Sequence, residues 1–109
     1  MATTYKVLGQ SRPSANTLTT AYTVPAATEA VISSIVVTNT GPTSTTYRIA
    51  IRPDGAAAAI GQYIAYDISV PTLDSLSLTL GITIDATDVI SVESYSGLVN
   101  FTIFGSEIA

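Results

Sequence analysis

The side chains that most enzymes use for proton transfer and nucleophilic attack are scarce in this sequence. It contains no histidine and no cysteine, so an imidazole base, an imidazole metal ligand and all thiol chemistry are excluded. The serines therefore lack their usual activating base, and Lys6, the one lysine, lies near the N-terminus outside any catalytic pattern. We expect a protein that is not an enzyme.

Paired carboxylates are the remaining route to catalysis, because two acids that flank a glycosidic bond can hydrolyse it. Asp85 and Asp88 are the closest pair of acids in the sequence, and Glu93 follows them. Segment 85–88 also has the composition of a hairpin turn, in which Asp side chains accept hydrogen bonds from nearby backbone N–H groups. We favour the turn. Since the other acids stand singly along the chain, we expect neither a calcium site nor any cofactor.

The charges are few and mostly negative. The sequence has eight acidic and four basic residues, which gives a net charge of -4. Nucleic-acid binding needs clustered Lys and Arg, so we expect no nucleic-acid partner. Polar residues interrupt every apolar run before it reaches the ~20 residues of a membrane span, and the first residues lack the pattern of a signal peptide. We expect no membrane partner and synthesis in the cytoplasm.

Alternating apolar and polar residues predict strands. In segment 76–84 every even position is a large apolar residue and every odd one is small or hydroxylated, which is the two-residue period of a sheet with one dry face. Segments 47–51 and 64–70 alternate similarly, with Tyr47, Ile49 and Ile51 inward in the first and the even positions inward in the second. Weaker patterns predict five more strands, at 5–8, 18–24, 31–39, 89–95 and 99–108.

Clusters of Pro, Gly, Asn and Asp separate these segments at regular intervals and supply the turns between them. The spacing predicts one domain, residues 1–109, with about eight strands in an antiparallel β-sandwich that resembles a jelly roll. Segment 55–61 alone has helix-forming composition, and we expect it to be a longer loop between the two sheets.

Segment 31–37 is apolar at both even and odd positions. It predicts either the central strand of a sandwich or a strand whose second face meets another subunit. Arg48 and Arg52 share the outward side of one predicted strand, about 13 Å apart, where they either protect an exposed face or contact a neighbouring subunit. The predicted subunit interface comprises Val31, Ile32, Ile35, Val36, Val37, Arg48 and Arg52.

Three parts of the chain resemble small virion proteins of tailed bacteriophages, including phages of aquatic bacteria. They are segment 4–10 (TYKVLGQ), segments 22–28 and 35–39 (YTVPAAT and IVVTN), and segment 101–108 (FTIFGSEI). The likeness covers nearly the whole chain. It implies a β-sandwich that lies on a capsid or tail and is repeated by symmetry, and it implies no catalytic residues.

We therefore expect a non-enzymatic structural protein of the virion, foremost a capsid decoration or cement protein. It would form a homotrimer and attach to the major capsid protein or other virion proteins through many weak symmetric contacts. A tail, collar or baseplate accessory protein is the next alternative. A receptor- or carbohydrate-binding module of a tail fibre is another, and it would need a concave patch of aromatic and acidic side chains.

Overall fold

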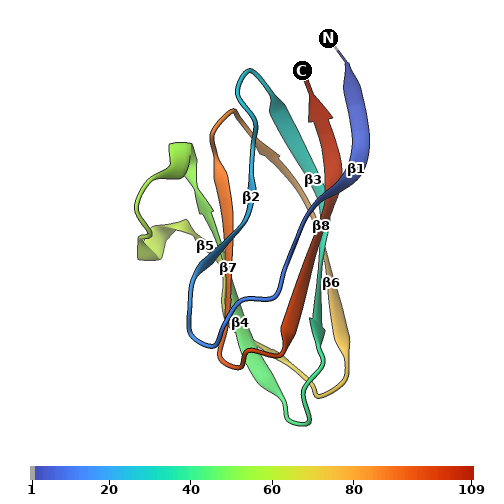
Figure 1. Ribbon diagram of the computed structural model, residues 1–109, viewed down its shortest axis with the longest axis vertical. Helices are drawn as coiled ribbons and strands as arrows, with labels where there is room; N and C mark the ends of the chain where they lie inside the picture. The colour runs from blue at the N-terminus through green and yellow to red at the C-terminus, as the bar shows by residue number, and fades with distance from the viewer. Residues whose placement is uncertain (1) are drawn as a thin grey trace.

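The protein is described by a computed structural model of residues 2–109, which gives every side chain in that range except that of Leu80 (Figure 1). All eight predicted strands are confirmed within this range. Their bounds are β1 (Thr3–Ser11), β2 (Thr19–Thr23), β3 (Glu29–Asn39), β4 (Thr45–Arg52), β5 (Tyr63–Val70), β6 (Ser75–Ile84), β7 (Val89–Ser94) and β8 (Val99–Ile108).

The strands form two four-stranded sheets, in the orders β1-β8-β3-β6 and β2-β7-β4-β5, and every recorded pairing is antiparallel. The chain changes sheet at every connection except β4–β5, which produces the strand order of a jelly roll. The two sheets lie side by side as layers in Figure 1. The predicted β-sandwich is thus confirmed.

The core lies between the two layers and is built from branched aliphatic side chains. Tyr47 and Phe101 are the largest of its fully buried side chains and meet edge to face, with 6.0 Å between ring centroids. Tyr47 and Ile49 point inward as their alternation predicts, and Ile51 packs partly against the core. Burial of such side chains is the main stabilising contribution to a domain without disulfides.

β3 is an internal strand with a bulge, and the bulge explains its apolar residues of both parities. Its pairing with β6 and β8 shifts between Ile32 and Ser34, so the inward side passes from even to odd positions. Ile32, Ile35 and Val37 are consequently fully buried inside the protomer. Their prediction as subunit-interface residues is wrong, because the opposite sheet already covers them.

The even positions of β5 do not all point inward, contrary to the prediction. Ile64 and Tyr66 are exposed, whereas Ala65 and Val70 are buried. The pairing with β4 shifts between Tyr47 and Ile49 and again directly after Ile49. Each shift inserts an extra residue into β5 and turns the following side chains to the other face.

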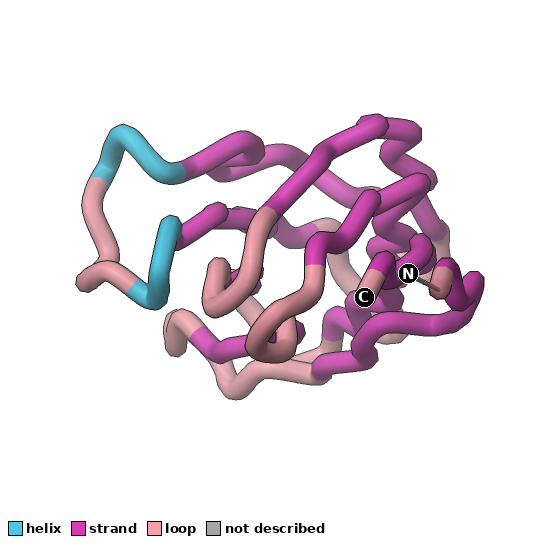
Figure 2. The backbone as a smooth tube through the Cα atoms, turned by 90° about the horizontal axis from the view of Figure 1, so that it is seen from above, coloured by secondary structure: helices cyan, strands magenta, loops and turns pink. Residues whose placement is uncertain are grey.

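The β4–β5 connection is a loop as predicted, but it does not cross between the sheets, because β4 and β5 pair with each other. It contains two short 3₁₀ turns, Pro53–Gly55 and Ile60–Gln62, and projects from one side of the sandwich (Figure 2). The Arg52 guanidinium donates to the carbonyl oxygens of Ala56 at 2.7 Å and Gly55 at 3.3 Å. Arg52 therefore anchors this loop.

β1 and β6 are the edge strands of the β1-β8-β3-β6 sheet, and β8 and β3 are its two internal strands. β8 lies between β1 and β3 and bonds to both along most of its length. β6 pairs with the other side of β3.

In the described part of the chain, no helix combines the length and apolar character needed to cross a bilayer.

Candidate functional site

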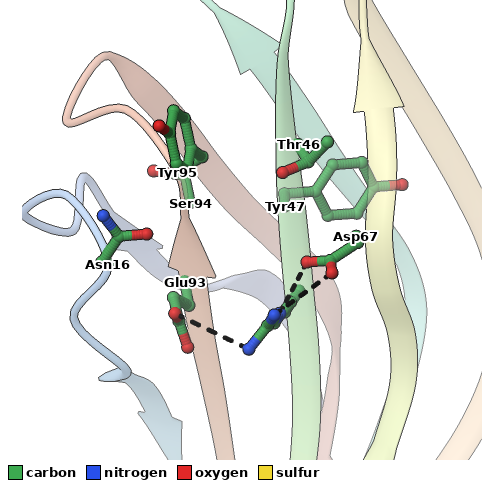
Figure 3. A pocket seen from close by; sticks show the side chains of 8 residues that line it. Asn16, Thr46, Tyr47, Asp67, Glu93, Ser94 and Tyr95 are labelled. Atoms are coloured by element: carbon green, nitrogen blue, oxygen red, sulfur yellow. Dashed lines mark hydrogen bonds and ion pairs between the residues drawn. The ribbon is translucent and has the colours of Figure 1, made fainter.

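A pocket of about 230 Å³ opens on the outer side of the β2-β7-β4-β5 sheet, close to where several turns meet (Figure 3). Polar side chains dominate its lining, and one exposed aromatic ring stands at the rim. The lining comes from the β1–β2 loop, from β4, β5 and β7, and from the turn after β7. It consists of Asn16, Thr46, Tyr47, Arg48, Asp67, Glu93, Ser94 and Tyr95.

Arg48 is the centre of this pocket and is held on three sides. Its Nε donates to Asp67 Oδ1 at 2.7 Å and its Nη2 to Asp67 Oδ2 at 3.2 Å, a bidentate pair of the stronger type. Its Nη1 lies 4.0 Å from Glu93 Oε2, beyond hydrogen-bond distance. The guanidinium also stacks 4.0 Å from the centroid of the Tyr66 ring, which in turn meets Tyr63 edge to face.

The ion pair shifts the pKa of both partners. The hydrogen bonds from Arg48 hold the pKa of the Asp67 carboxyl below its usual range, and those to Asp67 raise the pKa of the Arg48 guanidinium above its usual value. Both groups are therefore charged at neutral pH. Since the pair is exposed to solvent, it orients Arg48 more than it stabilises the fold.

The bulge in β5 is what brings Asp67 to Arg48. Asp67 has a positive φ of 53°, a conformation that Asp accepts more readily than most residues. Tyr47 pairs with Ile68 and Ile49 pairs with Ala65, so both Tyr66 and Asp67 oppose Arg48. One guanidinium thereby receives an aromatic face and a carboxylate from two adjacent residues.

Backbone hydrogen bonds fix the rim of the pocket. The Asn16 amide donates to the Ser94 carbonyl at 2.8 Å, which ties the β1–β2 loop to the end of β7. The Tyr95 amide donates to the Thr46 carbonyl at 3.0 Å, and the Ser94 hydroxyl bonds to the Ser96 carbonyl. Asn16 sits at a φ of 55°, a left-handed position that suits Asn. The pocket is preformed.

The predicted interface residues do not form one surface. Val31 and Val36 are half-buried on β3, in the other sheet, while Arg48 lies in the pocket and Arg52 holds the β4–β5 loop.

Asp85 and Asp88 form the predicted turn. The Ala86 amide donates to Asp85 Oδ1 at 2.8 Å, and the Asp85 amide donates to Asp88 Oδ2 at 2.9 Å.

Sequence reasoning missed most of the pocket. The outward position of Asp67 is confirmed, but its contact with Arg48 was not predicted, and Glu93 was considered only together with the 85–88 turn. Asn16 and Thr46 were not singled out, because they come from a separate loop and strand and share no pattern with the other lining residues. Within residues 2–109 no three acids converge closely enough to hold a metal ion.

No protein-family model matches the chain, and a search of curated proteins gave no match.

Proposed function

We propose that this protein is a non-enzymatic structural component of a tailed-bacteriophage particle, and specifically a decoration or cement protein that attaches to the assembled capsid. The observation that carries the proposal is an apolar patch on the outer side of the β1-β8-β3-β6 sheet. We call it the docking face and define it by Tyr5, Val7, Val31, Val36 and Phe104.

The docking face spans three strands, and Ser34 and Ser106 lie among its apolar side chains. Val7 pairs with Phe104 across β1 and β8, and Phe104 in turn opposes Ser34 of β3. Tyr5 is 82% exposed, Val7 48% and Phe104 38%. Neighbouring apolar side chains of this size, left open to water on one side of a small domain, are typical of a protein interaction surface.

The surroundings of this patch are hydroxylated instead of charged. The outward residues of β6 beside β3 are Ser75, Ser77 and Thr79, all exposed. Burial of a charge at an interface costs free energy unless the charge is paired well, so a surface of hydroxyl and apolar groups can be covered with little penalty. A virion protein that packs beside many copies of its neighbours would gain from such a surface.

The fold and the resemblance to phage virion proteins support the same proposal. Jelly rolls occur in virus capsids, although they also occur in lectins, so the fold alone does not specify a function. A single interface of ordinary stability needs about 800 Å² from each partner. Symmetric repetition on a particle would let a smaller contact suffice, because many weak contacts act together.

The test is to locate the protein in the virion. A reconstruction of the phage particle should place it on the outside of the capsid shell, with Tyr5 and Phe104 at the contact. In a binding assay on particles stripped of the protein, Tyr5→Ser should weaken attachment, whereas Tyr95→Ser, which removes another exposed ring in the turn after β7, away from the docking face, should not. Density only in the tail, collar or baseplate would favour the accessory role, and density only at a fibre tip would favour a receptor-binding module.

A further inference from the structure

We propose that the pocket around Arg48 is a binding site for a neutral saccharide. This inference is independent of where the protein sits in a particle, because the pocket and the docking face lie on opposite sheets. A protomer attached through Tyr5 and Phe104 would leave the pocket open to solvent.

The pocket offers hydrogen-bond donors and acceptors in close proximity. Arg48 can donate, the carboxylates of Asp67 and Glu93 can only accept, and the side-chain amide of Asn16 and the Thr46 hydroxyl can do both. These groups surround one hollow in Figure 3. A ligand whose groups both donate and accept fits this mixture best, and a saccharide hydroxyl is such a group.

The charges argue against ionic ligands. Two carboxylates and one guanidinium line the pocket, and the guanidinium already binds Asp67 on two atoms. An anion would meet the Glu93 carboxylate, whose distance of 4.0 Å from Arg48 Nη1 leaves its oxygens free to accept other hydrogen bonds. A cation would meet the Arg48 guanidinium. A neutral polyhydroxylated ligand avoids both repulsions.

The size and the rim suit one sugar ring. A volume of about 230 Å³ is below the roughly 300–1,000 Å³ of pockets for drug-sized ligands. Tyr95 is 70% exposed and stands beside Ser94 at the rim (Figure 3), where its ring can cover the apolar face of a sugar. Because backbone hydrogen bonds hold the main chain at Asn16 and Tyr95, binding would require little ordering of the rim backbone.

The test is a titration of the ¹⁵N-labelled protein with the methyl glycosides of glucose, galactose and mannose, followed by NMR. At least one should shift the amide signals of Asn16, Thr46 and residues 93–95 in a saturable manner. Methyl glucuronide, which adds a carboxylate, should bind at least about tenfold more weakly than the matching glucoside. Saturable shifts confined to other parts of the sheet, stronger binding of the glucuronide, or no shift with any of the three glycosides would overturn the proposal.

Two variants sharpen this test. Glu93→Gln keeps the shape of the side chain but replaces a carboxylate acceptor with an amide, and it should weaken binding about tenfold. Tyr95→Ser removes an exposed ring and should also weaken binding while the thermal midpoint stays within a few degrees of the wild type. Glu29→Gln, an exposed acid on the other sheet, is the control and should bind as the wild type does. Equal affinity in all three variants would contradict the assignment, whereas the docking proposal would be unaffected.

Discussion

Asn39 is a fully buried amide that joins three parts of the chain. Its Nδ2 donates to the carbonyl oxygens of Thr43 at 2.8 Å and of Val70 and Pro71 at 3.3 Å, and its Oδ1 accepts from the Gly41 amide at 2.9 Å. The end of β3, the following turn and the end of β5 are thereby held together. Buried polar groups without partners are costly.

Asn39→Ala should therefore destabilise the protein by about 3 kcal/mol, since one buried carbonyl, two partly buried carbonyls and one buried amide would lose their partner. Chemical denaturation measures this difference. Asn100→Ala is the matched control: the Asn100 side chain accepts one exposed hydrogen bond from Arg12, and its loss should cost about 0.5 kcal/mol. Similar effects of both substitutions would show that Asn39 does not have this role.

Glu107 is an acid on β8 that contacts the neighbouring strand and the opposite sheet. Its carboxylate lies 2.8 Å from Lys6 Nζ of β1 and accepts from the Tyr22 hydroxyl of β2 at 2.7 Å. The hydrogen bonds from Lys6 and then Tyr22 hold the pKa of Glu107 below its usual value. Burial and the same carboxylate raise the pKa of Tyr22, so the phenol stays protonated as the donor.

A carboxyl whose pKa is lower in the folded than in the unfolded state stabilises the fold above its unfolded pKa, and this contribution disappears as the pH falls through the folded pKa. Glu107→Gln should thus cost about 1 kcal/mol at neutral pH and less in acid, which makes the loss of stability on acidification shallower. Thermal midpoints from neutral pH to about pH 3 would measure this. A parallel pH profile for wild type and variant would exclude the effect.

At the scale of elements, β6 shows how an alternating pattern determines which face of a strand is covered. Leu76, Leu78 and Ile82 pack against the core, whereas Ser77 and Thr79 are exposed. Leu78→Asp would place an unpaired carboxylate against the core and should cost about 3 kcal/mol or more. Thr79→Asp should change stability by about 0.5 kcal/mol. Equal thermal midpoints of these two variants would mean that the assignment of faces is wrong.

The sequence predicts the strands well and the bulges poorly. Alternation is a local property, so the strand in 76–84 and the inward side of 47–51 follow from neighbouring residues alone. A bulge depends on the partner strand. Gly105 of β8 lies opposite Ile32, and a Cβ there would come within 2.1 Å of the Val31 carbonyl oxygen. This close approach lies beside the bulge in β3. The sequence does not reveal that β8 is the strand that pairs with β3 there, so the bulge could not be predicted.

The candidate site was beyond sequence analysis for the same reason. Arg48 and Glu93 could be placed on strands, but their adjacency depends on the register between β4 and β7, in which they pair. Asp67 reaches Arg48 only through the bulge in β5. Asn16 and Tyr95 join the site because their backbone amides donate to the carbonyl oxygens of Ser94 and Thr46, which lie on other segments of the chain. These contacts join residues that are far apart in the sequence, so no regular spacing of residues predicts them.

At the scale of the whole molecule, we predict that the isolated protein associates into a trimer. Three protomers at a three-fold position would triple the area offered to a symmetric capsid, so that avidity replaces the affinity of one small domain. Light scattering coupled to size exclusion measures the mass directly. A strict monomer at micromolar concentration would contradict the trimer.

The position of β8 between β1 and β3 has a consequence for how the chain reaches this structure. β1 finds its hydrogen-bonding partner about a hundred residues later in the chain, in segment 101–108. During synthesis on the ribosome, β1 and one side of β3 would therefore wait unpaired until the last strand emerges, and only its arrival completes the sheet. Contacts so distant in sequence close slowly, on the order of milliseconds to seconds for sandwiches of this type. This layer is thus expected to assemble only after β8 has been synthesised.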